Sequence, residues 1–358
     1  MPEQMNAHYT VHLLGGLRVV VDPRPEVRIG VEGMAPYITF ERPPKSELRG
    51  RISSLPLQQI GVETIYHVGQ ISGSFPPTWE IFDGDLTHCL KVEREEWSFV
   101  RHFAHVNRMQ KVTDISERVS TYLEILNIRL RQISESYSKT LRSRLSGAQP
   151  PKLGLASTLY MQEIEAALHA FFPDAAAFRD LLAVGCWQLV LGQPADGIVK
   201  GISAFLKRAK NEQHSLAVEI LAASDDDGWI KCMSTIRDNL IHTAPLAHTH
   251  ALTLCDLREA ETQDSGKRLP YLHYPLTTEN WLPPPSIRLS SEESDKREMG
   301  RAYDAYFKFA SNSGDALEYA WRTLSSLVDL ARKLRVATGI RGEMPIFPGS
   351  ITFPGKAR

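Results

Sequence analysis

The segment DISERVSTYLEILNIRLRQISESYSKTLRSRL, residues 114–145, determines the fold class of most of this chain. Its apolar residues recur at spacings of three and four residues with hardly a break. That period places them on one face of a single amphipathic helix of about eight turns. Asp114 followed by Glu117 is typical of a helix start, and Pro150 and Pro151 end the segment.

More helices are predicted on the C-terminal side of this segment. The breaks between them fall at residues 173–174, 192–194 and 225–228, where proline, glycine and aspartate supply helix stop and N-cap signals. The short connections favour antiparallel neighbours and therefore a helical bundle. The predicted helices span about 157–172, 174–192, 196–210, 213–223 and 227–242.

The first third of the chain has a different texture, with short segments rich in valine, isoleucine, tyrosine, phenylalanine and threonine. Prolines and glycines separate these segments, as is typical of strands joined by turns. A small barrel, a sandwich and an antiparallel sheet all fit this pattern, which leaves the choice among them open. The predicted strands are 9–13, 17–21, 37–41, 63–69, 79–82 and 87–92.

After Pro245 the helical pattern lapses before it returns. Weak alternation over 248–257 and 269–276 predicts a β-hairpin or an irregular excursion, and helices are expected at 292–310 and 314–336. The sequence thus predicts an α+β protein. We expect a β-rich domain over 1–112, a helical domain over 113–340 with an insertion at about 246–290, and a flexible or strap-like tail over 341–358.

Charge is balanced over the 358 residues, with 41 lysines and arginines against 42 aspartates and glutamates. No global field therefore attracts nucleic acid or membranes, and a polyanionic partner would need a local basic patch. One set of basic side chains offers such a patch, although a solvated helix face is the ordinary role of each member. The set is Arg129, Arg131, Arg142, Arg144, Lys207, Arg208 and Lys210.

Several classes of protein are disfavoured by what the sequence lacks. The longest apolar run, residues 181–191, is too short to span a bilayer, and residues 1–8 show no basic region followed by an apolar stretch. The four cysteines lack paired CxxC spacing, which favours reduced thiols in a cytoplasmic protein over a disulfide framework or a zinc site. We therefore expect no metal and no cofactor.

One stretch, TIRDNLIHT at residues 235–243, carries candidate chemistry at the end of a predicted helix. Asp238 and His242 fall on one helical face at i and i+4. Arg237 is five residues from His242, so the two point roughly 140° apart on an ideal helix. A site that uses both side chains therefore needs local distortion, or a second copy of the motif across a two-fold axis.

These residue types suit metal-independent cleavage of RNA. The imidazole of His242 can accept the proton of a ribose 2′-hydroxyl, and the guanidinium of Arg237 offers a fixed fork of donors to phosphate oxygens. Asp238 can orient either group. The reaction would be an internal transesterification that leaves a 2′,3′-cyclic phosphate and a 5′-hydroxyl.

The sequence RDNLIH, residues 237–242, resembles the R-polar-x-x-x-H signature of the HEPN superfamily. The resemblance implies a helical bundle, a homodimer through the motif helix, and an RNA substrate. Arg237 and His242 would be catalytic, with Asp238 at the polar second position. It also implies a toxin–antitoxin or phage-defence setting, with an antitoxin or another defence component as a partner protein. It covers at most residues 114–243 and 292–336, and the excursion over 247–287 departs from the family pattern.

Two alternatives accompany this hypothesis. The stretch 268–273 (RLPYLH) has the same spacing between arginine and histidine, but Pro270 disfavours a helix there. The sequence is also compatible with a non-catalytic helical module that binds a protein or a nucleotide, with Arg237, Asp238 and His242 in structural roles. Arg237 and Asp238 would then belong to a solvated helix face, and His242 would interact with the helix dipole.

Overall fold

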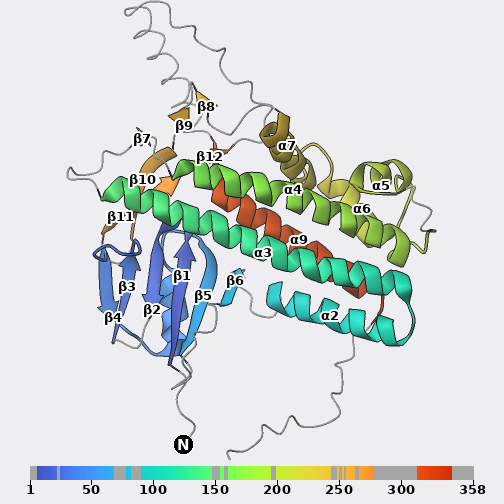
Figure 1. Cartoon of the computed structure of the whole chain (residues 1–358), viewed down its shortest axis with the longest axis horizontal. Coiled ribbons are helices and arrows are strands. Elements are labelled where there is room, and N and C mark those ends of the chain that lie inside the picture. Colours follow the sequence, from blue (N-terminus) through green and yellow to red (C-terminus); the bar gives the residue numbers. More distant parts are fainter. Residues whose placement is uncertain are drawn as a thin grey trace, which may run out of the picture.

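The computed structural model describes residues 6–21, 25–67, 78–81, 90–146, 154–156, 160–194, 199–242, 248–249, 252–253, 255–262, 266–276 and 313–340. It confirms the predicted α+β class, with an N-terminal antiparallel sheet followed by a mostly helical region (Figure 1). None of the described helices is long and apolar enough to cross a membrane.

The sheet consists of six strands in the order β4-β3-β2-β1-β5-β6, and each pair of neighbours is antiparallel. Of the three β architectures that the sequence left open, the structure has the antiparallel sheet. The strands are β1 (Asn6–Leu13), β2 (Arg18–Val21), β3 (Glu26–Gly30), β4 (Ile38–Glu41), β5 (Gln59–His67) and β6 (Thr78–Ile81).

Strand β3 and helix α1 (Lys45–Ser53) were not among the predicted elements. Pro23 and Pro25 made the start of β3 resemble a turn, and α1 carries hardly any amphipathic signal because most of its residues are polar. Both are held by the sheet: Val27 and Ile29 of β3 share a buried cluster with Ile52 of α1. Tertiary packing, rather than local pattern, therefore stabilises these two elements.

The two faces of the sheet differ in chemistry because successive side chains along a strand alternate in direction. One face is apolar and buried, and it includes Val11, Leu13, Val19 and Val21. The opposite face carries polar side chains on the same strands. His12 of β1 lies opposite Arg18 of β2, and Thr10 of β1 lies opposite Glu63 of β5.

The helical region is built around α3 (Gln110–Leu145), which packs against α2 (Leu90–Val106), α4 (Met161–Gly185) and α9 (Ala316–Ala337) (Figure 1). The predicted long helix is confirmed, but its expected start is wrong. Asp114 lies inside the helix near Arg118, because α2 leads into α3 through a tight turn in which Arg108 has a positive φ of 58°. The predicted strand 87–92 is also wrong at its end, since Leu90 begins α2.

The predicted break at Pro173 is wrong, because α4 continues through this residue. A proline inside a helix removes one backbone hydrogen bond and clashes with the preceding turn, at a cost of about 3 kcal/mol. Phe171, Phe172 and Phe178 flank it and are fully buried in the bundle, so packing of this apolar face offsets the local cost. A five-residue π-helical turn, Cys186–Val190, follows the helix.

Shorter helices complete the described bundle, namely α5 (Ile202–Arg208), α6 (Ser215–Ala223) and α7 (Trp229–His242). The hairpin expected within 248–276 is confirmed: β10 (Cys255–Glu261) pairs with β11 (Arg268–His273) and with β7 (Gly154–Ala156). Two short strand pairs are also present: β8 (His248–Thr249) pairs with β9 (Leu252–Thr253), and β12 (Pro275–Leu276) pairs with β13 (Gly314–Asp315). The predicted helix 292–310 and the tail 341–358 lie outside the described residues.

The sheet meets α3 at a glycine turn between β1 and β2. Gly16 has a φ of 93°, and a Cβ atom there would lie 2.7 Å from the backbone carbonyl of Tyr137. Gly15, with a φ of 76°, approaches the side chain of Tyr271 just as closely. Because both contacts involve positive φ and little space, only glycine allows the sheet to reach the helix here.

We expect Gly16→Ala to lower the free energy of unfolding by about 2–4 kcal/mol, combining left-handed backbone strain with overpacking against α3. Gly192→Ala is a matched control, because Gly192 has a φ of 64° but no neighbouring atom within 4 Å of the place where a Cβ atom would lie. It should cost only about 1–2 kcal/mol of backbone strain. Urea denaturation of the two variants checks the difference, and equal losses would contradict the close approach.

A buried polar cluster fixes the start of α9. The Asp315 carboxylate accepts hydrogen bonds from the backbone N–H groups of Leu317 and Glu318, from the backbone N–H of Tyr274, and from the hydroxyl of Tyr137. His273 Nδ1 lies 3.7 Å from the same carboxylate. Asp315 is 4% exposed, and burial raises its pKa to about 7.

This raised pKa predicts that the fold gains stability as the pH falls. Between the unfolded value near 3.9 and the folded value of about 7, the folded state binds more protons, so stability is lost as pH rises through 7. Relative to Asp315→Asn, the wild-type protein should lose about 2–3 kcal/mol of unfolding free energy between pH 5 and pH 8. Parallel pH profiles in urea denaturation would contradict this expectation.

Candidate functional site

The predicted motif lies on α7, which packs on α4. Its apolar stripe, Ile230, Met233, Ile236 and Leu240, is buried, with each side chain at most 2% exposed. The opposite face therefore projects away from the bundle. This is the arrangement that helical periodicity predicts for an amphipathic surface helix.

The polar face of α7 holds two of the three predicted site residues. Arg237 donates from Nη1 to Oδ1 of Asp238 over 2.8 Å, and their side chains are 38% and 54% exposed. His242 is the last residue of α7, and its side chain lies outside the described residues. The structure thus brings Arg237 and Asp238 together at the surface, while the roles assigned to His242 and to a dimer stay predictions.

The competing arginine–histidine pair lies on a strand. Arg268 and His273 are the first and last residues of β11, with Pro270 between them, so the expectation that this stretch is not helical is confirmed. Arg268 is exposed, whereas His273 is 4% exposed and sits beside Asp315. The two side chains therefore lie in different environments, one at the surface and the other in the interior.

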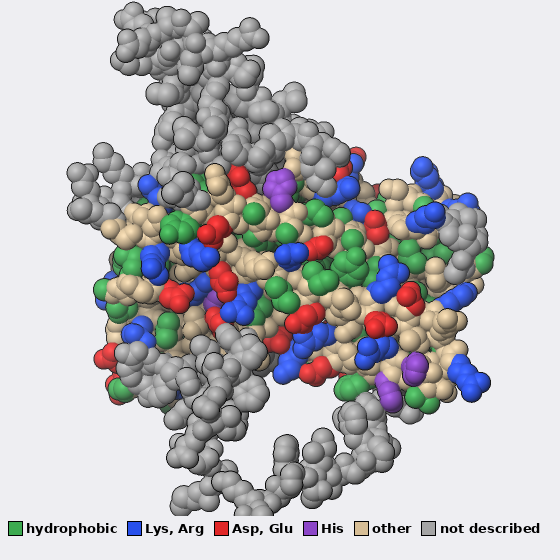
Figure 2. Space-filling view, in the orientation of Figure 1, with side chains coloured by type: hydrophobic (Ala, Val, Ile, Leu, Met, Phe, Trp, Pro, Cys, Tyr) green, Lys and Arg blue, Asp and Glu red, His purple; other side chains and the backbone are tan. Residues whose placement is uncertain are grey.

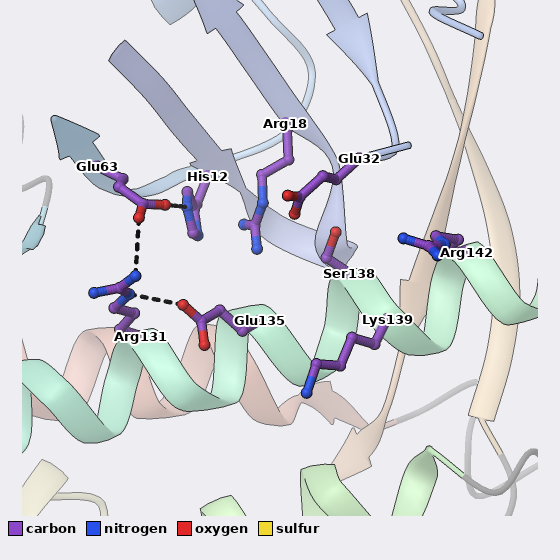
Figure 3. A pocket seen from close by; sticks show the side chains of 9 residues that line it. All are labelled: His12, Arg18, Glu32, Glu63, Arg131, Glu135, Ser138, Lys139 and Arg142. Carbon is purple, nitrogen blue, oxygen red and sulfur yellow. Dashed lines mark hydrogen bonds and ion pairs between the residues drawn. The ribbon is translucent and has the colours of Figure 1, made fainter. Parts of the chain in front are cut away.

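A polar cleft lies between the sheet and α3 (Figure 3), whereas the motif helix α7 lies against α4 (Figure 1). It encloses a cavity of about 230 Å³. Side chains from β1, β2, β5, the turn after β3 and α3 reach it, which makes it a junction of the two parts of the fold. The lining residues are His12, Arg18, Glu32, Glu63, Arg131, Glu135, Ser138, Lys139 and Arg142.

Helix α3 contributes side chains that lie on one of its faces. Arg131, Glu135, Ser138 and Arg142 are separated by four, three and four residues, which places them on one face of α3. Arg131 anchors the outer wall, because its guanidinium donates to Glu135 at 2.7 Å and to Glu63 of β5 at 2.8 Å. This bridge joins the helix to the sheet across the cleft.

A second set of bonds holds His12 and Arg18 in place. Arg18 donates from Nη1 to Oγ of Ser134 at 3.1 Å, and the same hydroxyl lies 3.1 Å from Nδ1 of His12. The Ser134 hydroxyl can accept from Arg18 and donate its own proton to Nδ1, and Nε2 faces the Glu63 carboxylate at 3.4 Å, which favours the ring form with its hydrogen on Nε2. His12 is one of the residues that line the cleft.

The Nε2–H group of His12 has no hydrogen-bond partner among the described residues. Oε2 of Glu63 lies 3.4 Å away, without hydrogen-bonding geometry. His12 is 1% exposed, and burial, with the nearby charges of Arg18 and Arg131, lowers its pKa well below 6.5. The ring is thus neutral at pH 7 and presents one unpaired donor. Trp79 packs edge-on against it, 4.4 Å between ring centroids.

Ser134, His12 and Glu63 have the residue types of a hydrolase triad, but the serine is not accessible to a substrate. Ser134 is fully buried and does not line the cavity. A nucleophile must reach the substrate carbonyl to react. The geometry therefore assigns Ser134 to positioning His12 and Arg18 rather than to nucleophilic attack.

Arg18 is the unusual charge of the cleft. Its side chain is 3% exposed, and it bonds only to the hydroxyl and the backbone carbonyl of Ser134. No carboxylate among the described residues lies within ion-pair distance of its guanidinium. Burial lowers its pKa to about 10, against the opposing effect of the nearby carboxylates of Glu32, Glu135 and Glu63, so it stays charged at pH 7. A buried guanidinium without a bonded counterion is costly, and an anion in the cavity would offset that cost.

Other donors face the same space. The Ser138 hydroxyl is buried and unpaired among the described residues, and it lines the cavity. Lys139 is bonded to Glu163 at 2.8 Å, whereas Arg142 lies at the mouth with no ion pair among the described side chains. Glu32 lies beside Arg18 on the sheet side of the cleft (Figure 3). Because Glu63 and Glu135 share Arg131, the cleft as a whole carries little net charge.

The sequence alone predicted a different site. Its pattern placed Arg131 and Arg142 in a basic set of helix residues, but it did not connect them to His12, Arg18, Glu32 or Glu63. The one available signal was the alternation along the first two predicted strands, which puts a histidine and an arginine on a face opposite valines and leucines. Arg129, from the same basic set, bonds instead to Asp174.

Comparison with protein-family models, curated proteins and solved structures finds no match for this chain. The resemblance to the HEPN superfamily therefore rests on residues 237–242 and their helical setting alone. Among the described residues, no group of three or more histidine, cysteine, aspartate or glutamate side chains is arranged to hold a metal ion.

Proposed function

We propose that this protein binds a small anionic ligand in the cleft between the sheet and α3. The observation that carries the proposal is Arg18, a buried guanidinium without a carboxylate partner among the described residues. Its neighbours His12 and Ser138 line the same cavity, and each holds a buried polar atom that is unpaired among the described residues. A guanidinium presents its donors in a fixed fork that matches phosphate or carboxylate oxygens.

The mixed charge of the lining favours a compact ligand over a long polyanion. Glu32, Glu63 and Glu135 stand among the cations and would repel a continuous phosphate backbone. The exterior supports the same conclusion, because positive and negative side chains are interspersed on the face seen in Figure 2, with no single-sign patch over the described surface there.

Calorimetric titration with inorganic phosphate, at constant ionic strength and with chloride as the reference salt, tests the proposal. We expect saturable binding, accompanied by a shift of the His12 ring signals in the NMR spectrum because Nε2–H gains an acceptor. If phosphate and simple carboxylates bind no better than chloride and leave His12 unchanged, the cleft is not an anion site.

We also propose ribonuclease activity at the exposed face of α7 as a second candidate function. It is supported by the pairing of Arg237 with Asp238 at the surface, at the end of a helix whose other face is buried. In this proposal a homodimer through α7 binds RNA and brings two motifs together. Incubation of the full chain with RNA in EDTA should yield 2′,3′-cyclic phosphate ends, and intact RNA would refute it.

A further inference from the structure

Three cavities that share lining residues follow one another from the polar face of the sheet to the side of α3, and together they are called the groove. The cavity under α3 shares Arg18, Glu32 and Glu63 with a cavity of about 360 Å³ over β2 and β3. On its other side it shares Lys139 and Arg142 with a cavity of about 420 Å³ along the end of α3. Together they offer the size that ligand sites for small molecules usually have.

The type of residue that lines the groove differs from one cavity to the next. The first cavity, over the sheet, has a mixed lining: the apolar side chains of Val20, Val31, Met34 and Pro36 lie beside Thr10 and Arg28 and beside the charged residues that it shares with the junction, Arg18, Glu32 and Glu63. The junction holds the carboxylates of Glu32 and Glu63 next to Arg18. The last cavity is lined by Lys139, Arg142, Ser143, Ser146 and Tyr160, without a carboxylate from the described residues.

We infer that the groove binds a nucleoside di- or triphosphate, an inference that rests on the proposed anion site. The base would lie over Met34 and Pro36, the ribose hydroxyls would donate to Glu32, and the phosphates would extend from Arg18 to Arg142. This order matches the order of the cavities. Carboxylates are suited to ribose hydroxyls, and arginine is suited to phosphate oxygens.

The geometry of the outer end supports more than one phosphate. Ser138 and Ser146, which line successive cavities, are eight residues apart on α3 and its C-cap, or about 12 Å along the helix axis. Arg142 lies at this end close to the turn after β3, since its Nη1 would lie 3.1 Å from a Cβ atom at Gly33. Lys139 already bonds Glu163, so Arg142 is the cation available to a terminal phosphate.

Two other ligands fit less of the groove. An inorganic polyphosphate would leave the part of the cavity near Met34 and Pro36 unfilled and would place charge beside Glu32. A longer oligonucleotide would bring successive phosphates past Glu32, Glu63 and Glu135. A single nucleotide with its phosphates at one end avoids both conflicts.

Calorimetric titration of the full chain in EDTA with ATP, AMP, adenosine and tripolyphosphate tests this inference. We expect ATP to bind at least tenfold more tightly than tripolyphosphate and AMP, and adenosine to bind weakest. Arg142→Gln should weaken ATP at least tenfold but AMP less than threefold. Met34→Gln should weaken ATP and AMP at least fivefold and leave tripolyphosphate unchanged. Arg118→Gln, at an exposed residue of α3 near Asp114, is the matched control.

The outcomes separate this inference from the anion site on which it rests. If tripolyphosphate or inorganic phosphate binds in an Arg18-dependent way and as tightly as ATP, the nucleotide assignment is wrong and the anion site stands. If Met34→Gln leaves the affinity for ATP unchanged while the variant melts like the wild type, the base does not occupy the sheet cavity. If none of the anions binds, both proposals fail.

Discussion

Arg18→Met is expected to weaken binding of phosphate-bearing ligands by at least about 100-fold, while the melting temperature of the unliganded protein stays the same or rises. The affinity falls because two charge-assisted hydrogen bonds are lost, each worth about 1.5–3 kcal/mol. The stability is kept because the substitution removes a buried charge that forms no ion pair among the described residues and bonds only Ser134, and burial of a charge without such a partner is costly.

The combination of lost binding and retained stability is the diagnostic result. Replacing an arginine that has a purely structural role, or one that belongs to a satisfied ion pair, would instead lower the stability of the protein. Arg129→Met is the matched control on α3, because Arg129 bonds Asp174 outside the cleft, and it should leave anion binding unchanged. Thermal denaturation and calorimetry on the same samples give both readouts. Unchanged phosphate affinity in Arg18→Met would remove the central support of the proposed function.

Arg237→Ala and His242→Ala are each expected to reduce RNA cleavage at least about 1,000-fold if α7 carries ribonuclease activity. His242→Ala removes the proton acceptor for the ribose 2′-hydroxyl. Arg237→Ala removes the donor that stabilises charge on the phosphate in the transition state. Arg237 is surface-exposed, and its guanidinium bonds only its neighbour Asp238 among the described residues, so its replacement should not unfold the bundle.

Arg268→Ala provides the control for this second prediction. Arg268 begins the other stretch with the same arginine–histidine spacing, and its side chain is exposed on β11. This variant should cleave RNA at the wild-type rate. Gel-based cleavage of labelled RNA in EDTA measures all variants, and the ribonuclease proposal is lost if Arg237→Ala and His242→Ala both cleave like the wild type.

Much of the fold could be predicted because burial imposes a local period. The spacing of apolar residues predicted α3, α7 and α9, and alternation together with turn residues predicted most strands of the first sheet. The errors occurred where a local signal was outweighed by packing. Helix α4 continues through Pro173 because buried phenylalanines flank this residue. Asp114 lies within α3 because α2 turns directly into that helix.

The exposed polar face of α7 follows from the sequence alone, because a single amphipathic helix fixes which side chains point outward. The cleft does not. Its parts, such as His12 and Ser134, are 122 residues apart and meet only because the glycine turn after β1 lets the sheet touch α3. A periodic pattern records whether a residue is buried. Whether the charge of Arg18 has an ion-pair partner among the described residues depends instead on which distant side chains the folded chain places around it.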